Sequence, residues 1–281
     1  LKALATPWHI YKLLPTFTDA LKAPTGKLVL RGCRRCGFVF NGAFNEKLLD
    51  YSSEYDATPE YSPLFKSFVA KTAKNLYKRH NLKNKKVVEI GCGKGHFVKL
   101  LYGLGAKNLS GFDPAYSNHY PEINKLVTKK FFNPKRLKEK ADFVISREVL
   151  EHIPRPRKFV QSIKQILSSN GKIYLSVPNL EWAIKHSAFF DFIYEHCNYF
   201  SANSLTNLLY LSEFGQINIS YGIDRQFLHA EASRGFKSAI STPAVNFDKI
   251  PKFIDEKMNL YKKAANAWGN FAVWGVAGKG T

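Results

Sequence analysis

The chain has 281 residues, of which 45% are hydrophobic and 14% aromatic, and it carries a formal net charge of +20. This is enough for a real core in one or two domains. No apolar run approaches the roughly 20 residues of a membrane span, and Leu1–Ala20 lacks a signal-peptide layout, so we expect no membrane as a partner. The positive net charge favours anionic partners such as nucleic acid or a phosphorylated sugar, although a solvated lysine-rich surface without such a partner would carry the same net charge.

The N-terminal segment contains a cysteine pair. Three prolines and Gly26 interrupt Leu1–Leu28, which we expect to be irregular. Leu28–Asn41 is expected to form a β-ribbon around Cys33 and Cys36, as in a zinc knuckle. A C-x-x-C pair supplies two of the four ligands that zinc requires. The alternatives are a knuckle that binds no metal, or one whose second pair precedes Leu1. The four cysteines suggest no disulfide framework, so we expect a cytoplasmic location.

The next segment combines tyrosines with a helix. Tyr51, Tyr55 and Tyr61 lie in a proline-bounded loop whose aromatic hydroxyls suit a substrate lid. The spacing of apolar residues then predicts an amphipathic helix from about Pro63 to His80.

From Lys86 onward, strand and helix patterns alternate. Strands are expected at Val87–Gly91, Leu109–Asp113, Leu126–Thr128, Asp142–Ser146 and Lys172–Val177, with helices at Gly95–Leu104 and Arg157–Ser169. This order predicts an α/β fold with a doubly wound, largely parallel sheet. The chain then continues through a closing strand pair at Ile217–Tyr221 and Gln226–Ala230, a basic helix at Lys249–Ala267, and a second strand-then-glycine pattern at Phe271–Gly280.

The stretch from Lys86 to Phe97 organises the chain. A β-branched run ends in a turn with three alternate glycines, at 91, 93 and 95, which let the backbone approach a ligand. Glu89 is a carboxylate in an otherwise apolar strand, which is costly unless a polar group meets it. The spacing is G-x-G-x-G and not the G-x-G-x-x-G of a dinucleotide site. A structural glycine-rich turn in another α/β fold is the alternative.

The sequence E-x-G-C-G-x-G resembles motif I of the class I S-adenosylmethionine-dependent methyltransferases. The resemblance implies a Rossmann-like methyltransferase sheet and a cofactor with its own ammonium group. That group would pair with the carboxylate of Glu89. The cofactor-binding residues implied in this loop are Glu89, Gly91, Cys92, Gly93 and Gly95.

Two later stretches fit the same site. Asp113, followed by Pro114, ends the next expected strand, where an acidic residue can accept two hydrogen bonds from a ribose diol. The same position in the family binds the ribose; the alternative is a helix N-cap. Phe132 is placed to flank an adenine edge, or else to pack in the core.

The stretch from Ser146 to Ile153 resembles the family's segment after its fourth strand. The resemblance implies that Ser146, Arg147 and Glu148 lie beside the cofactor. His152 is interpreted either as a helix-end histidine with satisfied hydrogen bonds or, less readily, as a catalyst.

The segment Asp191–Ser201 carries Tyr194, Glu195 and His196 side by side. A histidine titrates near neutrality, and a neighbouring carboxylate tunes its pKa. The run Y-E-H-x-x-Y-F-S resembles the sugar-nucleotide C-methyltransferases. That resemblance implies a nucleotide-linked 4-keto-6-deoxy sugar as substrate and proton abstraction by His196, assisted by Glu195 and Tyr194. One of the three loop tyrosines, such as Tyr55, closes over the sugar. A buried structural pair is the alternative.

The resemblance also divides the chain. It implies an N-terminal lobe at 1–62, a methyltransferase domain at 63–240, and a helix with the start of a truncated C-terminal domain at 241–281. The alternative enzyme is an O- or N-methyltransferase acting on RNA or protein. We do not expect nucleic acid as a partner, because the basic residues are not interleaved with stacking aromatics. The remaining alternative is a binding protein that kept the pocket without catalysis.

Overall fold

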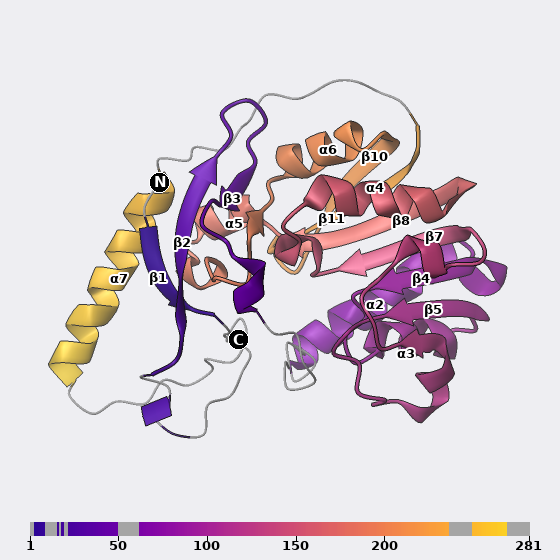
Figure 1. The fold of residues 1–281 in the computed structure, drawn as a ribbon, viewed down its shortest axis with the longest axis horizontal. Coiled ribbons are helices and arrows are strands. Elements are labelled where there is room, and N and C mark those ends of the chain that lie inside the picture. Colours follow the sequence, from indigo (N-terminus) through magenta and orange to yellow (C-terminus); the bar gives the residue numbers. More distant parts are fainter. Residues whose placement is uncertain are drawn as a thin grey trace.

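The computed structural model describes residues 3–8, 16, 18–19, 22–49, 62–235 and 249–268. The tyrosine loop with Tyr51, Tyr55 and Tyr61 and the expected strand within Phe271–Gly280 lie outside these residues. The described chain builds a seven-stranded sheet and a four-stranded sheet, which occupy opposite sides of the molecule in Figure 1.

The larger sheet has the strand order β10-β11-β8-β7-β4-β5-β6. Its strands are β4 (Lys86–Ile90), β5 (Asn108–Phe112), β6 (Val127–Thr128), β7 (Ala141–Arg147), β8 (Leu167–Pro178), β10 (Phe214–Gly222) and β11 (Phe227–Arg234). All pairings among β4 to β8 are parallel. Only β11 is reversed, because it pairs antiparallel with both β8 and β10. The expected α/β fold with a largely parallel sheet is therefore confirmed.

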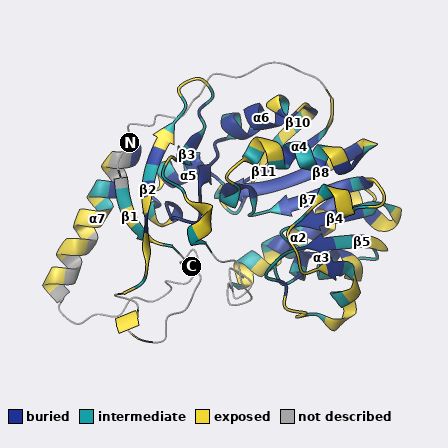
Figure 2. Ribbon diagram, in the orientation of Figure 1, coloured by how far each residue is buried: buried dark blue, intermediate teal, exposed yellow. Residues whose placement is uncertain are grey.

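Helices cover both faces of this sheet. Adjacent residues of a strand point to opposite faces, so Val87 joins one apolar core and Val88 the other. The first core includes residues of α2 (Pro63–Arg79) and α3 (His96–Gly103), and the second includes residues of α4 (Pro156–Ile166) and α6 (Ala202–Leu211). Figure 2 shows the strands buried between helices whose outer faces are exposed.

Most expected elements are present, with two corrections. The helix expected to end at Ser169 stops at Ile166, and β8 begins at Leu167 rather than Lys172. A register irregularity lets Leu167 pair with Ala141 before the regular ladder starts at Lys172, so no alternating pattern marks this first part of the strand.

The second correction concerns the N-terminus. The segment expected to be irregular contains β1 (Ala3–Pro7), which pairs antiparallel with β2 (Thr25–Gly32). Pro7 is the last residue of β1 and Pro24 precedes β2. Proline is tolerated at such strand ends, because it interrupts few ladder hydrogen bonds there.

The remaining helices are short, apart from the last. They are α5 (Leu180–Lys185), α7 (Lys249–Trp268), and the 3-10 helices η1 (Glu46–Leu48), η3 (Leu82–Asn84), η4 (Pro121–Leu126), η5 (Pro134–Arg136), η6 (Leu150–His152) and η7 (Phe189–Asp191). Among the described residues, we find no helix with the length and hydropathy needed to cross a membrane.

The smaller sheet combines distant parts of the chain. It has the order β1-β2-β3-β9, where β3 is Val39–Asn41 and β9 is Asn198–Tyr199. Its core joins Leu28 and Val39 with Tyr199 and with Ile254 of α7, and Figure 1 shows α7 beside β1. The boundaries at residues 62 and 240 stay a prediction, but β9 comes from within the range assigned to the methyltransferase domain.

Asn41 ties this smaller sheet together. Its Oδ1 accepts hydrogen bonds from the backbone N–H groups of Val29 at 2.8 Å and Ala43 at 3.0 Å, and its Nδ2 donates to the carbonyl of Lys27 at 3.1 Å. The side chain is buried. A buried backbone group that loses its partner is destabilising by about 1–3 kcal/mol.

We therefore expect Asn41→Ala to lower the free energy of unfolding by about 2–4 kcal/mol, because more than one buried backbone group loses its hydrogen-bond partner. Urea unfolding would measure the change. Asn133→Ala is the matched control, since this exposed asparagine accepts a single hydrogen bond from Lys135 N–H and its loss should be under about 1 kcal/mol. Equal losses in the two variants would contradict the assignment.

Candidate functional site

The centre of the large sheet creates a crevice at its carboxyl edge. From β4, the chain continues to β5 and β6 on one side, and to β7 and β8 on the other. Ligands of open α/β sheets bind outside the strand ends at such a reversal of direction. Ile90 and Ser146 are register partners on β4 and β7, so the residues that follow them lie at this edge.

The loop after β4 is shaped by glycines. Gly91 has a φ of +74°, and a Cβ added there would lie 2.1 Å from Cγ2 of Val149. Gly93 also has a positive φ, of +53°, but a Cβ there would meet nothing within 4 Å. The first glycine is therefore required by packing. The second faces open space, as expected where a ligand approaches the backbone.

Glu89 lies beneath this loop. It is 3% exposed, and its Oε2 has no hydrogen-bond partner in the described part of the chain. Burial raises the pKa of Glu89 to about 8, and the nearby positive charge of Arg147 offsets part of that rise. An unpaired buried carboxyl group is unfavourable, and a cationic group above the loop would satisfy it.

Asp113 connects the ends of β4 and β5. Its Oδ2 accepts a hydrogen bond from Gly93 N–H at 2.8 Å, and its Oδ1 accepts one from Ala115 N–H at 2.7 Å. The alternative role as a helix N-cap is wrong, because a turn follows and the next helix, η4, begins after Tyr120. A carboxylate has about four acceptor sites, so each oxygen can accept a further hydroxyl proton.

The other expected cofactor residues surround these two acids. Ser146 is buried, and its hydroxyl has no hydrogen-bond partner among the described residues. The guanidinium of Arg147 lies 4.5 Å from the ring centroid of Phe97. Cys92 is buried beside Gly111, Pro114 is half-buried after Asp113, and the ring of Phe132 meets Phe112 edge-on at 5.7 Å.

The predicted catalytic group is only partly assembled. His196 is 6% exposed, its Nδ1 lies 3.1 Å from the carbonyl oxygen of Asp191, and its ring centroid lies 5.0 Å from that of His152. The Tyr194 hydroxyl instead accepts a hydrogen bond from Asn45 N–H at 2.9 Å. Tyr194 therefore contacts the segment between β3 and η1, while His196 packs against the end of η6.

His152 has more contacts than its position in the sequence revealed. It ends η6, as the helix-end interpretation requires, and its Nδ1 lies 2.9 Å from the carbonyl oxygen of Glu195. Its ring also packs against His196. Burial lowers the pKa of His152, so the neutral form is favoured. The sequence contains the dipeptide Glu-His twice, at 151–152 and at 195–196, and this repetition was the one indication of a contact between the two histidines.

The cysteine pair lies at the turn between β2 and β3. Cys33 N–H donates to the carbonyl of Phe38 at 2.8 Å, and Gly37 N–H donates to that of Cys33 at 2.9 Å. Cys33 and Cys36 are free thiols and meet no third metal-ligand side chain within the described residues. The zinc knuckle stays a prediction.

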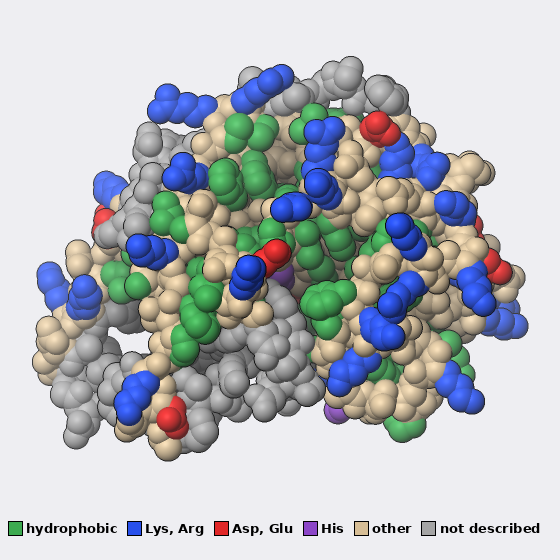
Figure 3. Space-filling model, in the orientation of Figure 1, with side chains coloured by type: hydrophobic (Ala, Val, Ile, Leu, Met, Phe, Trp, Pro, Cys, Tyr) green, Lys and Arg blue, Asp and Glu red, His purple; other side chains and the backbone are tan. Residues whose placement is uncertain are grey.

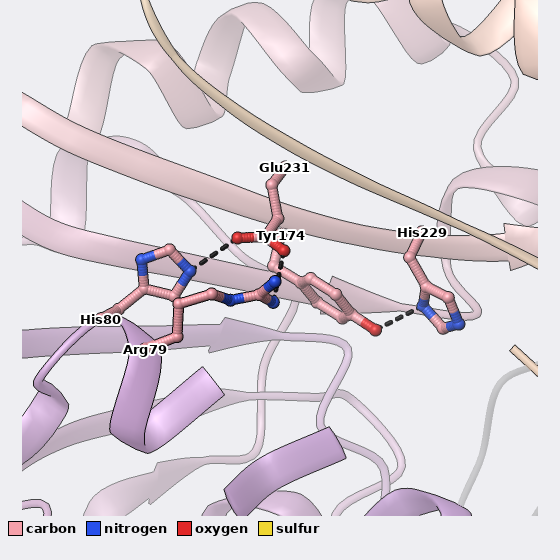
Figure 4. Close-up of polar contacts among 5 residues, drawn as sticks. All are labelled: Arg79, His80, Tyr174, His229 and Glu231. Atoms are coloured by element: carbon pink, nitrogen blue, oxygen red, sulfur yellow. Dashed lines mark hydrogen bonds and ion pairs between the residues drawn. The ribbon is translucent and has the colours of Figure 1, made fainter. Parts of the chain in front are cut away.

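A separate polar cluster joins α2 to β8 and β11 (Figure 4). The carboxylate of Glu231 binds Arg79 at 2.5 Å and His80 at 2.6 Å, and the Tyr174 hydroxyl hydrogen bonds to Nδ1 of His229. Burial lowers the pKa of His229 to about 4, so it is neutral near pH 7. These contacts fix α2 on the sheet. Figure 3 shows Lys and Arg dispersed over the visible face rather than gathered into one patch.

Solved structures share this fold. A Methanococcus maripaludis protein described as an S-adenosyl-L-methionine-dependent methyltransferase aligns with a TM-score of 0.51 and 16% identity, covering 68% of this chain and 97% of its own. A Nostoc punctiforme protein described as an O-methyltransferase aligns with a TM-score of 0.50 and 13% identity, covering 62% and 58%. At these identities the likeness concerns the fold alone.

Curated relatives are similar over a shorter range. A ubiquinone biosynthesis O-methyltransferase of Glaesserella parasuis is 34% identical over 116 residues, which are 36% of this chain and 49% of that protein. A tRNA U34 carboxymethyltransferase of Campylobacter hominis is 30% identical over 106 residues, 34% of this chain and 36% of that protein. The similarity therefore spans half or less of each relative.

A family model described as a methyltransferase domain matches residues 62–215. This range covers more than half of the 281 residues. It begins just before α2 and ends within β10, so it contains the crevice, the glycine loop and both histidines. The chain therefore belongs to the methyltransferase-domain family.

Proposed function

We propose that S-adenosylmethionine binds in the crevice outside β4, β5 and β7. Glu89 pairs with the ammonium group of its methionine part, and Asp113 accepts hydrogen bonds from the ribose hydroxyls. Gly93 provides the open backbone against which the ligand lies. The buried Oε2 of Glu89 supports this proposal most directly, because the described protein offers it no partner. When bound, the cofactor supplies an electrophilic methyl group.

This assignment predicts a pH dependence. The raised pKa of Glu89, about 8, keeps the carboxyl group of the free protein mostly protonated at pH 6, whereas an ammonium group pairs with the ionised form. Binding then releases a proton, so the affinity for S-adenosylhomocysteine should rise from pH 6 towards pH 8, by at most about tenfold per pH unit.

Calorimetric titration across this pH range would measure the effect. Glu89→Gln should bind more weakly and with a flat profile. Glu122→Gln is the matched control, because this acid is exposed and pairs with Lys99; it should keep the wild-type slope. A Glu89→Gln profile as steep as that of the wild type would exclude Glu89 as the titrating group.

We propose a small-molecule acceptor, a nucleotide-linked keto-deoxy sugar that is methylated on the carbon beside its ketone. The imidazole of His196 supports a role as the base. A carbonyl oxygen only accepts hydrogen bonds, so the contact with Asp191 holds the proton on Nδ1 and leaves the lone pair on Nε2. That lone pair would take the proton from carbon, and the C–H electrons would move into an enolate. The enolate carbon would then accept the methyl group of bound S-adenosylmethionine, whose sulfur keeps the electron pair of the broken C–S bond.

The neighbouring residues have different roles in this proposal. The Glu195 carbonyl orients His152. Tyr194 acts at a distance from the reacting atoms, since its hydroxyl pairs with the backbone of Asn45. Tyr55 keeps its proposed role of closing over the sugar.

Hydrogen exchange tests the base. With a keto-sugar nucleotide, S-adenosylhomocysteine and deuterated water, the wild type should exchange the proton beside the ketone without methylating it. His196→Ala should slow this exchange by about 10²–10⁴-fold. His186→Ala removes an exposed imidazole that stacks on Trp182 and should exchange at the wild-type rate. Wild-type exchange in a His196→Ala variant that still binds S-adenosylhomocysteine would refute the role.

An O- or N-methyltransferase acting on another substrate, such as RNA, is the alternative. The names of the two relatives, an O-methyltransferase and a tRNA-modifying enzyme, favour it, as does the net charge of +20. RNA binding that weakens steeply with salt and competes with turnover would support it. With a ¹³C-labelled methyl donor, the methyl resonance of the product separates attachment to carbon from attachment to oxygen or nitrogen.

A further inference from the structure

Three titratable side chains meet at the carboxyl edge, next to the residues assigned to the cofactor. Glu151 and His152 belong to η6, and His196 comes from the segment between η7 and β9. One carboxylate oxygen and one nitrogen of each ring lie within 4.8 Å of one another. Among the described residues, this is the only group of three or more such side chains close enough to hold one metal ion.

Both imidazoles are held in the same tautomer. Nδ1 of His152 lies 2.9 Å from the carbonyl of Glu195, and Nδ1 of His196 lies 3.1 Å from that of Asp191. Each Nδ1 therefore carries the proton, and each Nε2 carries the lone pair. Histidines that ligate metals almost always donate the other ring N–H in this way, because the hydrogen bond orients the ring and makes the ligand nitrogen more basic.

Hydrogen bonds from side chains of one segment to backbone carbonyls of the other hold the two segments together. The Cys197 thiol donates to the carbonyl of Glu151 at 3.4 Å, and Nδ2 of Asn198 donates to the carbonyls of Leu150 at 3.1 Å and Ile153 at 2.6 Å. Ligand atoms of a tetrahedral zinc site lie about 3.4 Å apart. To reach this spacing from separations of up to 4.8 Å, the ligand atoms must approach one another by roughly 1 Å.

We infer that Glu151, His152 and His196 bind a divalent transition-metal cation. Two imidazole nitrogens and one carboxylate oxygen suit Zn²⁺, Co²⁺ or Fe²⁺, whereas Mg²⁺ and Ca²⁺ prefer oxygen ligands alone. Three protein ligands leave a further coordination position for water or an acceptor oxygen. This site is separate from the cysteine pair at Cys33 and Cys36.

Metal binding has a consequence that rests on the proposed function. If Nε2 of His196 takes the proton from the acceptor, a bound cation occupies the same lone pair. The cation and the proton then compete, so the transition metal inhibits proton exchange and a chelator restores it. Metal binding itself does not depend on this role.

Cobalt provides a probe that is independent of activity. The experiment uses the full chain carrying Cys33→Ser and Cys36→Ser, so that thiolates at that pair do not take the metal. We expect Co²⁺ to produce visible absorption bands and Zn²⁺ to displace it, while millimolar Mg²⁺ leaves the spectrum unchanged. Glu151→Gln and His152→Gln, which approximate the original shapes, should each weaken Co²⁺ binding by at least about tenfold.

His186→Ala is the matched histidine control and should bind Co²⁺ like its parent. Circular dichroism and thermal melting identify any variant that fails to fold. Absence of Co²⁺ binding at 1 mM, or unchanged affinity in both folded cluster variants, would overturn the site. Cobalt binding without inhibition of exchange would overturn only the competition for His196, and loss of exchange in metal-free His196→Ala tests the base separately.

Discussion

The parallel pairing of β4 with β7 is the contact on which the site depends. It aligns Ile90 with Ser146, while β5 aligns Phe112 with Ile90 on the other side. Glu89, Asp113 and Arg147 therefore arrive at one edge from three strands separated in sequence. A one-residue slip of β4 would turn Glu89 to the opposite face of the sheet. The apolar residues of β4 oppose such a slip, because each would have to leave its core on one face of the sheet for the core on the other face.

The segment between η7 and β9 connects the two sheets at this edge. Tyr194 reaches Asn45 near the smaller sheet, whereas His196 packs against His152 at the end of η6. β9 then pairs with β3. The smaller sheet thus does more than extend the fold. It fixes the backbone that presents His196, so changes in its packing will alter the geometry of the proposed base.

The sequence predicted the places of Glu89, the glycine loop and Asp113 in the fold better than the contacts of Tyr194 and His196. The glycine loop and Asp113 directly follow strands with clear apolar patterns, and parallel strands bring their carboxyl ends together. The meeting of His152 with His196 depends on an aperiodic connection and on long-range packing. Likewise, β9 has two residues, too few for an alternating pattern, and the proline-interrupted sequence obscured the pairing of β1. Tyr194 and His196 are close in sequence but contact different parts of the protein, which their spacing in the sequence does not indicate.

The pairing of β3 with β9 also bears on how the protein is made. Val39 pairs with Tyr199, about 160 residues later in the chain. At a ribosomal elongation rate of about 5–20 residues per second, β3 waits about 8–32 s for its partner to be synthesised. During that interval its outer hydrogen-bonding edge is open to other extended chains. The protein is therefore exposed to misassociation through this edge until β9 has been made, which happens after β4 to β8 and before β10 and β11.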